Sequence, residues 1–319
     1  MRFSLTPEQL ALRQEIRDYF AGWVTPEFRD ALFDELQQGE GGQLHEDSAR
    51  KIGRDGWLGV GWPVEYGGKG WGAVEQYLFF EEVTFAGASI PMLALNTVGP
   101  AIMRFGSEEQ KNRILPAILR GECSISIGYS EPGAGTDLAS LRTRAELDGE
   151  EWVINGQKMF TTGAQYADYI WLAARTDPDA PKHKGITVFL VDTSLPGFSV
   201  VPIHTLMART NMTYYDNVRV PKNAVVGDVN AGWQLITTQL NNERVSMVSV
   251  GFFERAYEDV RRWALETKLA DGQRVIDREW VQTHLARVRA GIDVLRLMNW
   301  RVAWSIEHDC FQHSYASSV

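Results

Sequence analysis

Two stretches near the middle of the chain combine hydroxyl groups, glycines and an aromatic ring. The first is Tyr129–Asp137, Tyr-Ser-Glu-Pro-Gly-Ala-Gly-Thr-Asp, whose glycines allow the backbone to approach a flat ligand closely. The second, residues 152–162, is typical of a hairpin and places the Phe160 ring beside the hydroxyls of two threonines. Such residues can hold a ring cofactor by stacking and hydrogen bonding. A glycine-rich turn between strands has the same composition, so the residues alone leave both interpretations open.

These stretches fall in a strand-rich third of the chain. From Ser124 to Tyr129, small polar residues alternate with larger ones, which is typical of a strand. Further strands are expected at about 143–148, 151–162, 168–175, 185–193, 198–206 and 212–220. Six or seven short strands within about 100 residues predict a small antiparallel barrel or sandwich.

Helical periodicity dominates on both sides of this region. Thr6, Pro7 and Gln9 predict a capped helix start. More helices are expected at 73–86, 91–105, 107–120, 231–268 and 278–308, with a loop at 39–45. The sequence therefore predicts an α+β chain with an N-terminal helical domain (1–121), a middle antiparallel β-barrel domain (122–228) and a C-terminal helical domain (229–319).

The composition is that of an ordinary globular protein. The chain has 319 residues, 44% of them hydrophobic, and its net charge is −9. This hydrophobic content excludes intrinsic disorder, and the acidic balance argues against a nucleic-acid partner. No apolar run approaches the length of a membrane span, and the first residues lack the features of a signal peptide. We expect a cytoplasmic protein.

Several well-known motifs are missing. The chain has no complete G-x-G-x-x-G, no Walker A sequence, no H-E-x-x-H and no C-x-x-C. The six histidines do not cluster at ligand spacing, and Cys123 and Cys310 lie far apart, so no metal site is expected. A cofactor must therefore be held by some other arrangement.

Five dispersed stretches resemble the acyl-CoA dehydrogenase family, flavoproteins that desaturate acyl-CoA thioesters. They are 61–68, 105–122, Glu131–Asp137, Asn155–Lys158 and 218–227. They occur in the family's order, and the resemblance covers residues 1 to about 308.

The resemblance implies that the chain binds FAD. The positions that it implies for the cofactor are Ile127, Gly128, Tyr129, Ser130, Thr136, Phe160 and Thr162. The backbone of the first four would follow the flavin edge, with Ser130 bonding toward the ring. Phe160 would lie on the flavin and Thr162 near a ring nitrogen, while Thr136 would serve the flavin or the thioester.

The same resemblance implies a catalytic base on the first long C-terminal helix. The family reaction removes an α-proton and transfers a β-hydride to the flavin, so it needs a carboxylate shielded from water beside the α-carbon. In the family this glutamate occupies one of two places, and Glu243 matches the earlier one. Arg244 would face the CoA moiety, with Asn241 close by as a second substrate-binding residue. Taken in isolation, Glu243 and Arg244 also fit a solvated pair on a helix surface.

The chain departs from the family in two places. The arginine expected after this helix, which contacts the flavin of a neighbouring subunit, is missing from 266–273, with Arg274 as a weak substitute. The family's further C-terminal helices are not visible, so the apolar faces of the last two helices lack a cover. We expect a truncated gene product or fragment, the alternative being that another chain covers these faces.

The amino-acid sequence is most similar to actinobacterial acyl-CoA dehydrogenases of steroid side-chain (cholesterol) catabolism. The stretches that carry this resemblance are 127–137, 165–169, 240–246 and 279–282. Members of that subgroup work as α2β2 heterotetramers with one flavin per unlike pair. The resemblance thus implies a steroid side-chain CoA substrate, a second acyl-CoA dehydrogenase subunit and, from the family, an electron-transferring flavoprotein.

Two other functions compete with the FAD-dependent dehydrogenase. One is a non-catalytic or inactive truncated partner subunit, which would bind no flavin. The other keeps the fold but acts as a flavin oxidase or monooxygenase, which would consume oxygen with its substrate.

Overall fold

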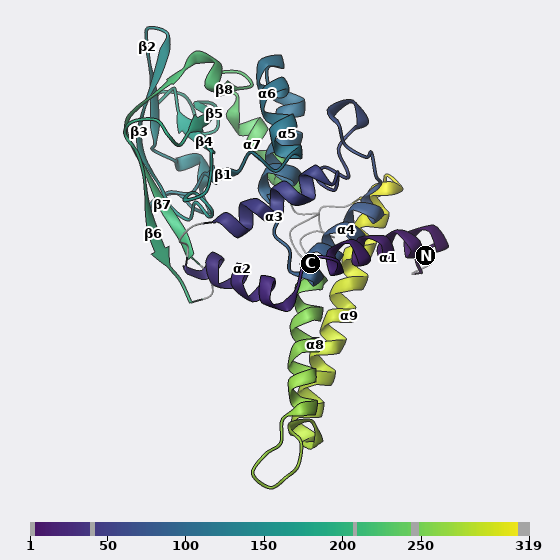
Figure 1. Ribbon diagram of the computed structural model, residues 1–319. Coiled ribbons are helices and arrows are strands. Elements are labelled where there is room, and N and C mark those ends of the chain that lie inside the picture. Colours follow the sequence, from purple (N-terminus) through teal and green to yellow (C-terminus); the bar gives the residue numbers. More distant parts are fainter. Residues whose placement is uncertain (1–3, 39–41, 207–208, 244–248, 312–319) are drawn as a thin grey trace. The chain divides into compact units, whose positions relative to one another are not determined.

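The computed structural model describes residues 4–38, 42–206, 209–243 and 249–311, without the side chains of 36–38 and 241–243. Within these ranges the chain forms two compact units that are interleaved along the sequence (Figure 1). The first unit draws on residues 1–29, 69–89 and 244–319, and the second on 30–68 and 90–243. The domain limits expected from the sequence stay a prediction.

The first unit is helical. It contains α1 (Pro7–Ala21), α4 (Ala73–Ala86), α8 (Val250–Glu266) and α9 (Glu279–Glu307), and α2 (Pro26–Gln38) begins in it. The predicted start at Thr6 is confirmed, because its side chain and that of Gln9 form a reciprocal capping box. Helix α4 packs against α1, α8 and α9, and its side chains from Tyr77 to Val83 are all buried. A helix that is buried on most of its faces belongs in a core.

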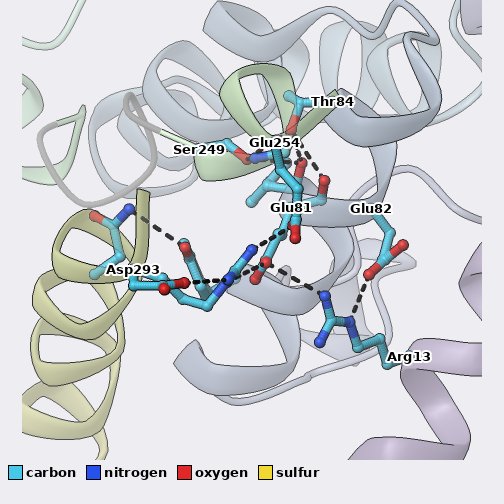
Figure 2. A network of polar contacts seen from close by, with 12 residues as sticks. Arg13, Glu81, Glu82, Thr84, Ser249, Glu254 and Asp293 are labelled. Atoms are coloured by element: carbon cyan, nitrogen blue, oxygen red, sulfur yellow. Dashed lines mark hydrogen bonds and ion pairs between the residues drawn. The ribbon is translucent and has the colours of Figure 1, made fainter. Parts of the chain in front are cut away.

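Charged side chains also join these four helices. Arg13 of α1 lies 2.6 Å from Glu82 and 3.4 Å from Glu81, both on α4 and both 1% exposed (Figure 2). Arg296 of α9 lies 3.0 Å from Glu81 and also pairs with Glu254 of α8. Buried carboxylates require such partners, and these arginines offset the cost of burying Glu81 and Glu82.

The predicted unbroken helix over 231–268 is wrong. Helix α7 (Gly232–Glu243) belongs to the second unit, whereas α8 begins at Val250 after Ser249, whose ψ of 135° is extended. The Ser249 hydroxyl accepts a hydrogen bond from the Gly251 amide and lies 2.6 Å from the Thr84 hydroxyl (Figure 2). Serine favours this capping position, and Gly251 allows close approach, because a Cβ there would lie 2.0 Å from the Glu81 carbonyl oxygen.

The second unit contains the sheet and its flanking helices. These helices are α3 (Gln43–Arg54), α5 (Gly99–Phe105), α6 (Glu108–Leu119) and α7, with the end of α2. The loop predicted at 39–45 extends too far, since α3 begins at Gln43. The helix predicted at 91–105 contains a π-helical segment, Ala94–Val98, which packs against α7 and β1. Across the ranges that the structure describes, no helix is long and apolar enough to cross a membrane.

The sheet has eight strands in the order β6-β7-β3-β2-β4-β5-β8, with β1 beside β4. Their bounds are β1 (Ile125–Gly128), β2 (Arg144–Asp148), β3 (Glu151–Lys158), β4 (Tyr169–Arg175), β5 (Ile186–Asp192), β6 (Phe198–His204), β7 (Arg209–Pro221) and β8 (Val225–Val226). The expected strand positions agree with the structure, but an antiparallel barrel is only a loose description of this sheet. The sheet is not closed, and β1 and β2 both pair with β4 in parallel. Alternating polarity identifies a strand but says nothing of the direction or partner of its pairing.

Candidate active site

The end of β1 is held tightly against its neighbours. A Cβ at Gly128 would lie 2.9 Å from the Ile170 side chain, so glycine allows β1 to approach β4 closely. Beyond Gly128, the Tyr129 carbonyl accepts a hydrogen bond from Lys158 at 3.1 Å, and the Ser130 carbonyl accepts one from the Met159 amide at 2.8 Å. Both carbonyls are therefore bonded to the end of β3 and to the residue that follows it.

A buried ion pair fixes the turn that follows. Lys158 Nζ lies 2.8 Å from Glu131, whose carboxylate also accepts the Arg142 and Thr143 amides at 2.7 and 2.9 Å. Burial lowers the pKa of Lys158 to about 8, against the opposing effect of Glu131. Burial alone would raise the pKa of Glu131, but Lys158 and the two amides outweigh it and lower that pKa. The ionised pair thus anchors the start of the glycine-rich segment.

Phe160 has an unusual conformation beside this turn. Its φ is +60°, in the left-handed region, and its ring is 56% exposed. The next residues are held on both sides: the Thr161 amide donates to the Asn211 carbonyl, and the Thr162 carbonyl accepts from the Ser126 hydroxyl, both at 2.9 Å. A strained non-glycine residue persists where the surrounding structure over-determines it, and such residues cluster at ligand sites.

Three predicted hydroxyls lie in this region with different surroundings. Thr162 is exposed, and its hydroxyl lies 3.0 Å from that of Thr210. The Ser130 hydroxyl is half-buried, and the Thr136 hydroxyl is exposed. Neither has a hydrogen-bond partner in the part of the chain that the structure describes. An exposed aromatic ring and hydroxyl groups on two joined stretches are residue types that suit a flat heteroaromatic group, which is the chemistry of an isoalloxazine ring.

The structure brings Ser130 and Phe160 together and does not test the whole predicted set. The bond from the amide of Met159, next to Phe160, to the Ser130 carbonyl joins the two stretches. Ile127 and Gly128 lie in β1, whose register pairs them with Trp171 and Leu172 of β4. Their roles toward a cofactor stay predictions.

Tyr129, one of the predicted cofactor positions, bonds two buried polar side chains that the sequence analysis does not predict, Trp171 and Gln239. The Trp171 indole N–H lies 2.9 Å from both the Tyr129 hydroxyl and the Gln239 amide oxygen. The Tyr129 hydroxyl also bonds to Gln239, which lies on α7. No local pattern marks this cluster, because its members come from three separate elements.

The predicted substrate-side residues lie at the end of α7. Glu243 is the last residue of that helix and Asn241 precedes it by two positions, but their side chains are not described. Arg244 lies outside the described residues. Helix α7 itself packs against the π-helical segment and against β5, within the same unit as β1. The roles of the three residues stay predictions.

Three family models match successive parts of the chain. They are the N-terminal domain of acyl-CoA dehydrogenase over residues 6–122, the middle domain over 126–218 and the C-terminal domain over 230–319. Acyl-CoA dehydrogenase FadE26 of Mycobacterium tuberculosis is 52% identical over 309 residues, 96% of this chain and 77% of its own length. FadE29 of the same organism is 49% identical, over 95% of this chain and 78% of its own length.

Solved structures of similar fold point to the same family. The crystal structure of the ChsE4-ChsE5 complex from Mycobacterium tuberculosis has a TM-score of 0.88 and 50% identity, and covers 100% of this chain and 81% of that chain. The Tcur3481-Tcur3483 steroid ACAD has a TM-score of 0.89 and 46% identity, with the same coverage. On these likenesses, the chain belongs to the acyl-CoA dehydrogenase family of flavin-dependent oxidoreductases.

Proposed function

We propose that this chain binds FAD and catalyses the α,β-desaturation of a steroid side-chain acyl-CoA thioester. The observation that carries the proposal is the exposed, left-handed Phe160, directly after Met159, whose amide donates a hydrogen bond to the Ser130 carbonyl. Phe160 would stack on the flavin, and the backbone of 127–130 would lie along its edge. Thr162 and Thr136 would add hydroxyl contacts.

Glu243 would act as the base. Its carboxylate would take the α-proton of the acyl group, and Asn241 and Arg244 would hold the thioester and the CoA moiety. Bound flavin supplies the acceptor for the β-hydride, so that a carbon–carbon double bond forms with the balance of two electrons and two hydrogens. The partner that we expect to take up the two electrons is an electron-transferring flavoprotein.

The steroid substrate and a second subunit are supported by the related structures. One is a complex of two different chains, ChsE4 and ChsE5, and the other is a steroid ACAD named for two chains. In this chain, α8 and α9 leave between them an apolar groove of about 410 Å³, lined by residues such as Phe253, Val260 and Val288. Exposed apolar grooves of this kind are typical of association surfaces, and we assign this one to a second acyl-CoA dehydrogenase subunit.

The variant Glu243→Gln tests the proposed chemistry. General-base catalysis contributes roughly 10²–10⁴-fold, so turnover of a cholestenoyl-CoA thioester should fall by about that factor while FAD stays bound. Glu258→Gln, the same change at a partly exposed position of α8, is the matched control and should keep wild-type activity. Both variants are made in the chain co-expressed with its second subunit.

Each other outcome points to a different function. Full activity of Glu243→Gln would remove Glu243 as the base. Oxygen consumption with the thioester would indicate a flavin oxidase. A chain that holds no FAD, alone or in the co-expressed complex, would be a non-catalytic subunit.

A further inference from the structure

The side chain of Gln239 has a buried donor with no acceptor. Gln239 is 1% exposed, and its Nε2 atom has no hydrogen-bond partner among the described residues. Buried polar groups in proteins are normally satisfied, and each exception requires an explanation. A buried amide N–H that stays unpaired after all contacts form is costly, unless a ligand or a water supplies the acceptor.

The orientation of this amide follows from its neighbours. The Trp171 indole N–H is only a donor, and it lies 2.9 Å from Gln239 Oε1. If the amide were turned over, Nε2 would face that N–H and two donors would oppose each other. The Tyr129 hydroxyl also bonds Oε1, so Oε1 accepts two hydrogen bonds, and neither Nε2 hydrogen meets an acceptor in the described part of the chain.

Gln239 connects two parts of the candidate site. It bonds to Tyr129, the residue directly after β1, whose own carbonyl is held by Lys158. It also lies on α7, four residues before Glu243. The unpaired donor therefore belongs to the helix that carries the proposed base and is tied to the strand that carries the proposed flavin contacts.

We propose that Gln239 is a ligand-binding residue whose Nε2 donates a hydrogen bond to an acceptor atom of the bound ligand. This inference rests on the proposed function, which supplies two ligands with such atoms: the carbonyl oxygens and ring nitrogens of the flavin, and the oxygens of the acyl thioester. Tyr129 and Trp171 hold the amide oxygen, so the amide nitrogen is oriented before the ligand arrives, and little order is lost on binding.

Two substitutions separate ligand binding from a structural role. Gln239→Met keeps the length of the side chain and removes both polar atoms, while Trp171 and Tyr129 still bond each other at 2.9 Å. Gln239→Glu keeps an oxygen for Trp171 and replaces the donor by an acceptor. Gln234→Glu makes the same chemical change at an exposed position of α7 and serves as the matched control.

The measurements use the full chain co-expressed with its second subunit. We would determine the dissociation constants of FAD, by flavin fluorescence, and of a cholestenoyl-CoA thioester, by spectral titration. We would also measure urea unfolding of the ligand-free protein. We expect Gln239→Met to weaken one of the two probes about tenfold and Gln239→Glu to weaken it further, because an acceptor then faces an acceptor. We expect Gln234→Glu to bind both probes as the wild type does.

The probe whose binding is weakened identifies the ligand that supplies the acceptor. Weaker FAD binding assigns the contact to the flavin, whereas weaker thioester binding with unchanged FAD assigns it to the substrate. If Gln239→Glu fails to fold, Gln239→Met alone carries the test. Wild-type affinity of both probes in both Gln239 variants would overturn the inference and leave a trapped water as the partner, with the proposed function intact. A wild type that binds neither probe would overturn both.

Discussion

Lys158 Nζ lies 2.8 Å from the Glu131 carboxylate, and Lys158 is completely buried. The same ammonium group bonds the Tyr129 carbonyl, so one lysine of β3 holds both the end of β1 and the turn after it. A buried charge of this kind is tolerated only with its partner, and the geometry of the candidate flavin site depends on the pair.

Removing one member of this pair should destabilise the protein strongly. Lys158→Met leaves the Glu131 charge buried without its partner, and such changes cost about 3–5 kcal/mol. The double variant Lys158→Met, Glu131→Gln should recover part of that loss, because no uncompensated charge remains. Urea unfolding of the wild type, both single variants and the double variant measures the coupling. Additive effects of the two substitutions would contradict it.

Two buried carboxylates should contribute to the free energy of unfolding with opposite dependence on pH. The pKa of Glu131 is lowered from 4.5, because Lys158 and two amides outweigh burial, so its contribution to stability is present above pH 4.5 and lost as the pH falls through the lowered value. The pKa of Glu81 is raised from 4.5 by burial, against Arg13 and Arg296, and one of its oxygens has no partner among the described residues. Its contribution is complete below pH 4.5 and is lost as the pH rises through the raised value.

Glutamine variants at the two positions test this contrast. Relative to the wild type, Glu131→Gln should lose more unfolding free energy at neutral pH than in acid. For Glu81→Gln, the loss relative to the wild type should be larger in acid than at neutral pH. Urea unfolding of the three proteins between pH about 3.5 and 8 measures both differences. Equal pH dependence of the two variants would refute the assignment.

Replacing Phe160 should keep or raise the stability of the ligand-free protein and lower its affinity for FAD. Asparagine tolerates a φ of +60° better than phenylalanine, and the ring is 56% exposed, so little burial is lost. Phe160→Asn should therefore leave the ligand-free protein as stable or about 1 kcal/mol more stable. FAD should bind roughly 3–10-fold more weakly, because stacking is lost.

Fluorescence titration and thermal unfolding follow these two effects. Asn217→Gly is the control, since Asn217 also has a positive φ of 53° but bonds Asn155 at the β3–β7 pairing. We expect that control to bind FAD like the wild type. Undiminished FAD affinity of Phe160→Asn would remove Phe160 from the cofactor site.

The groove between α8 and α9 should affect assembly. Val288 is 50% exposed on α9 and lines the groove, so Val288→Lys should leave folding unchanged within about 0.5 kcal/mol. If a second acyl-CoA dehydrogenase subunit covers this groove, a lysine there should weaken association at least about tenfold, because a charge would be buried. Size-exclusion chromatography of the co-expressed chains measures the complex, with exposed Arg287→Ala as the control. Full-size complex with Val288→Lys would place the interface elsewhere.

Local sequence signals identified most elements of the fold. The capping box at Thr6, the helix at 73–86 and the strand positions depend on residues within a few positions of each other, and the structure confirms them. The break at Ser249 escaped prediction because the hydroxyl that supports it, on Thr84, is 165 residues away. The pairing of β1 with β4 in parallel is likewise a choice between distant strands.

The candidate site divides in the same way. The sequence by itself determined the family, and it marked the stretch 129–137 and the ring of Phe160 as candidates for the cofactor site. These signals are runs of neighbouring residues. Only the tertiary structure decided that Lys158 pairs with Glu131, that Phe160 is held with a positive φ, and that Gln239 meets Trp171 and Tyr129. Gln239 lies 68 positions from Trp171 and 110 positions from Tyr129 in the sequence. The contacts between them depend on burial in a packed core that no local pattern encodes.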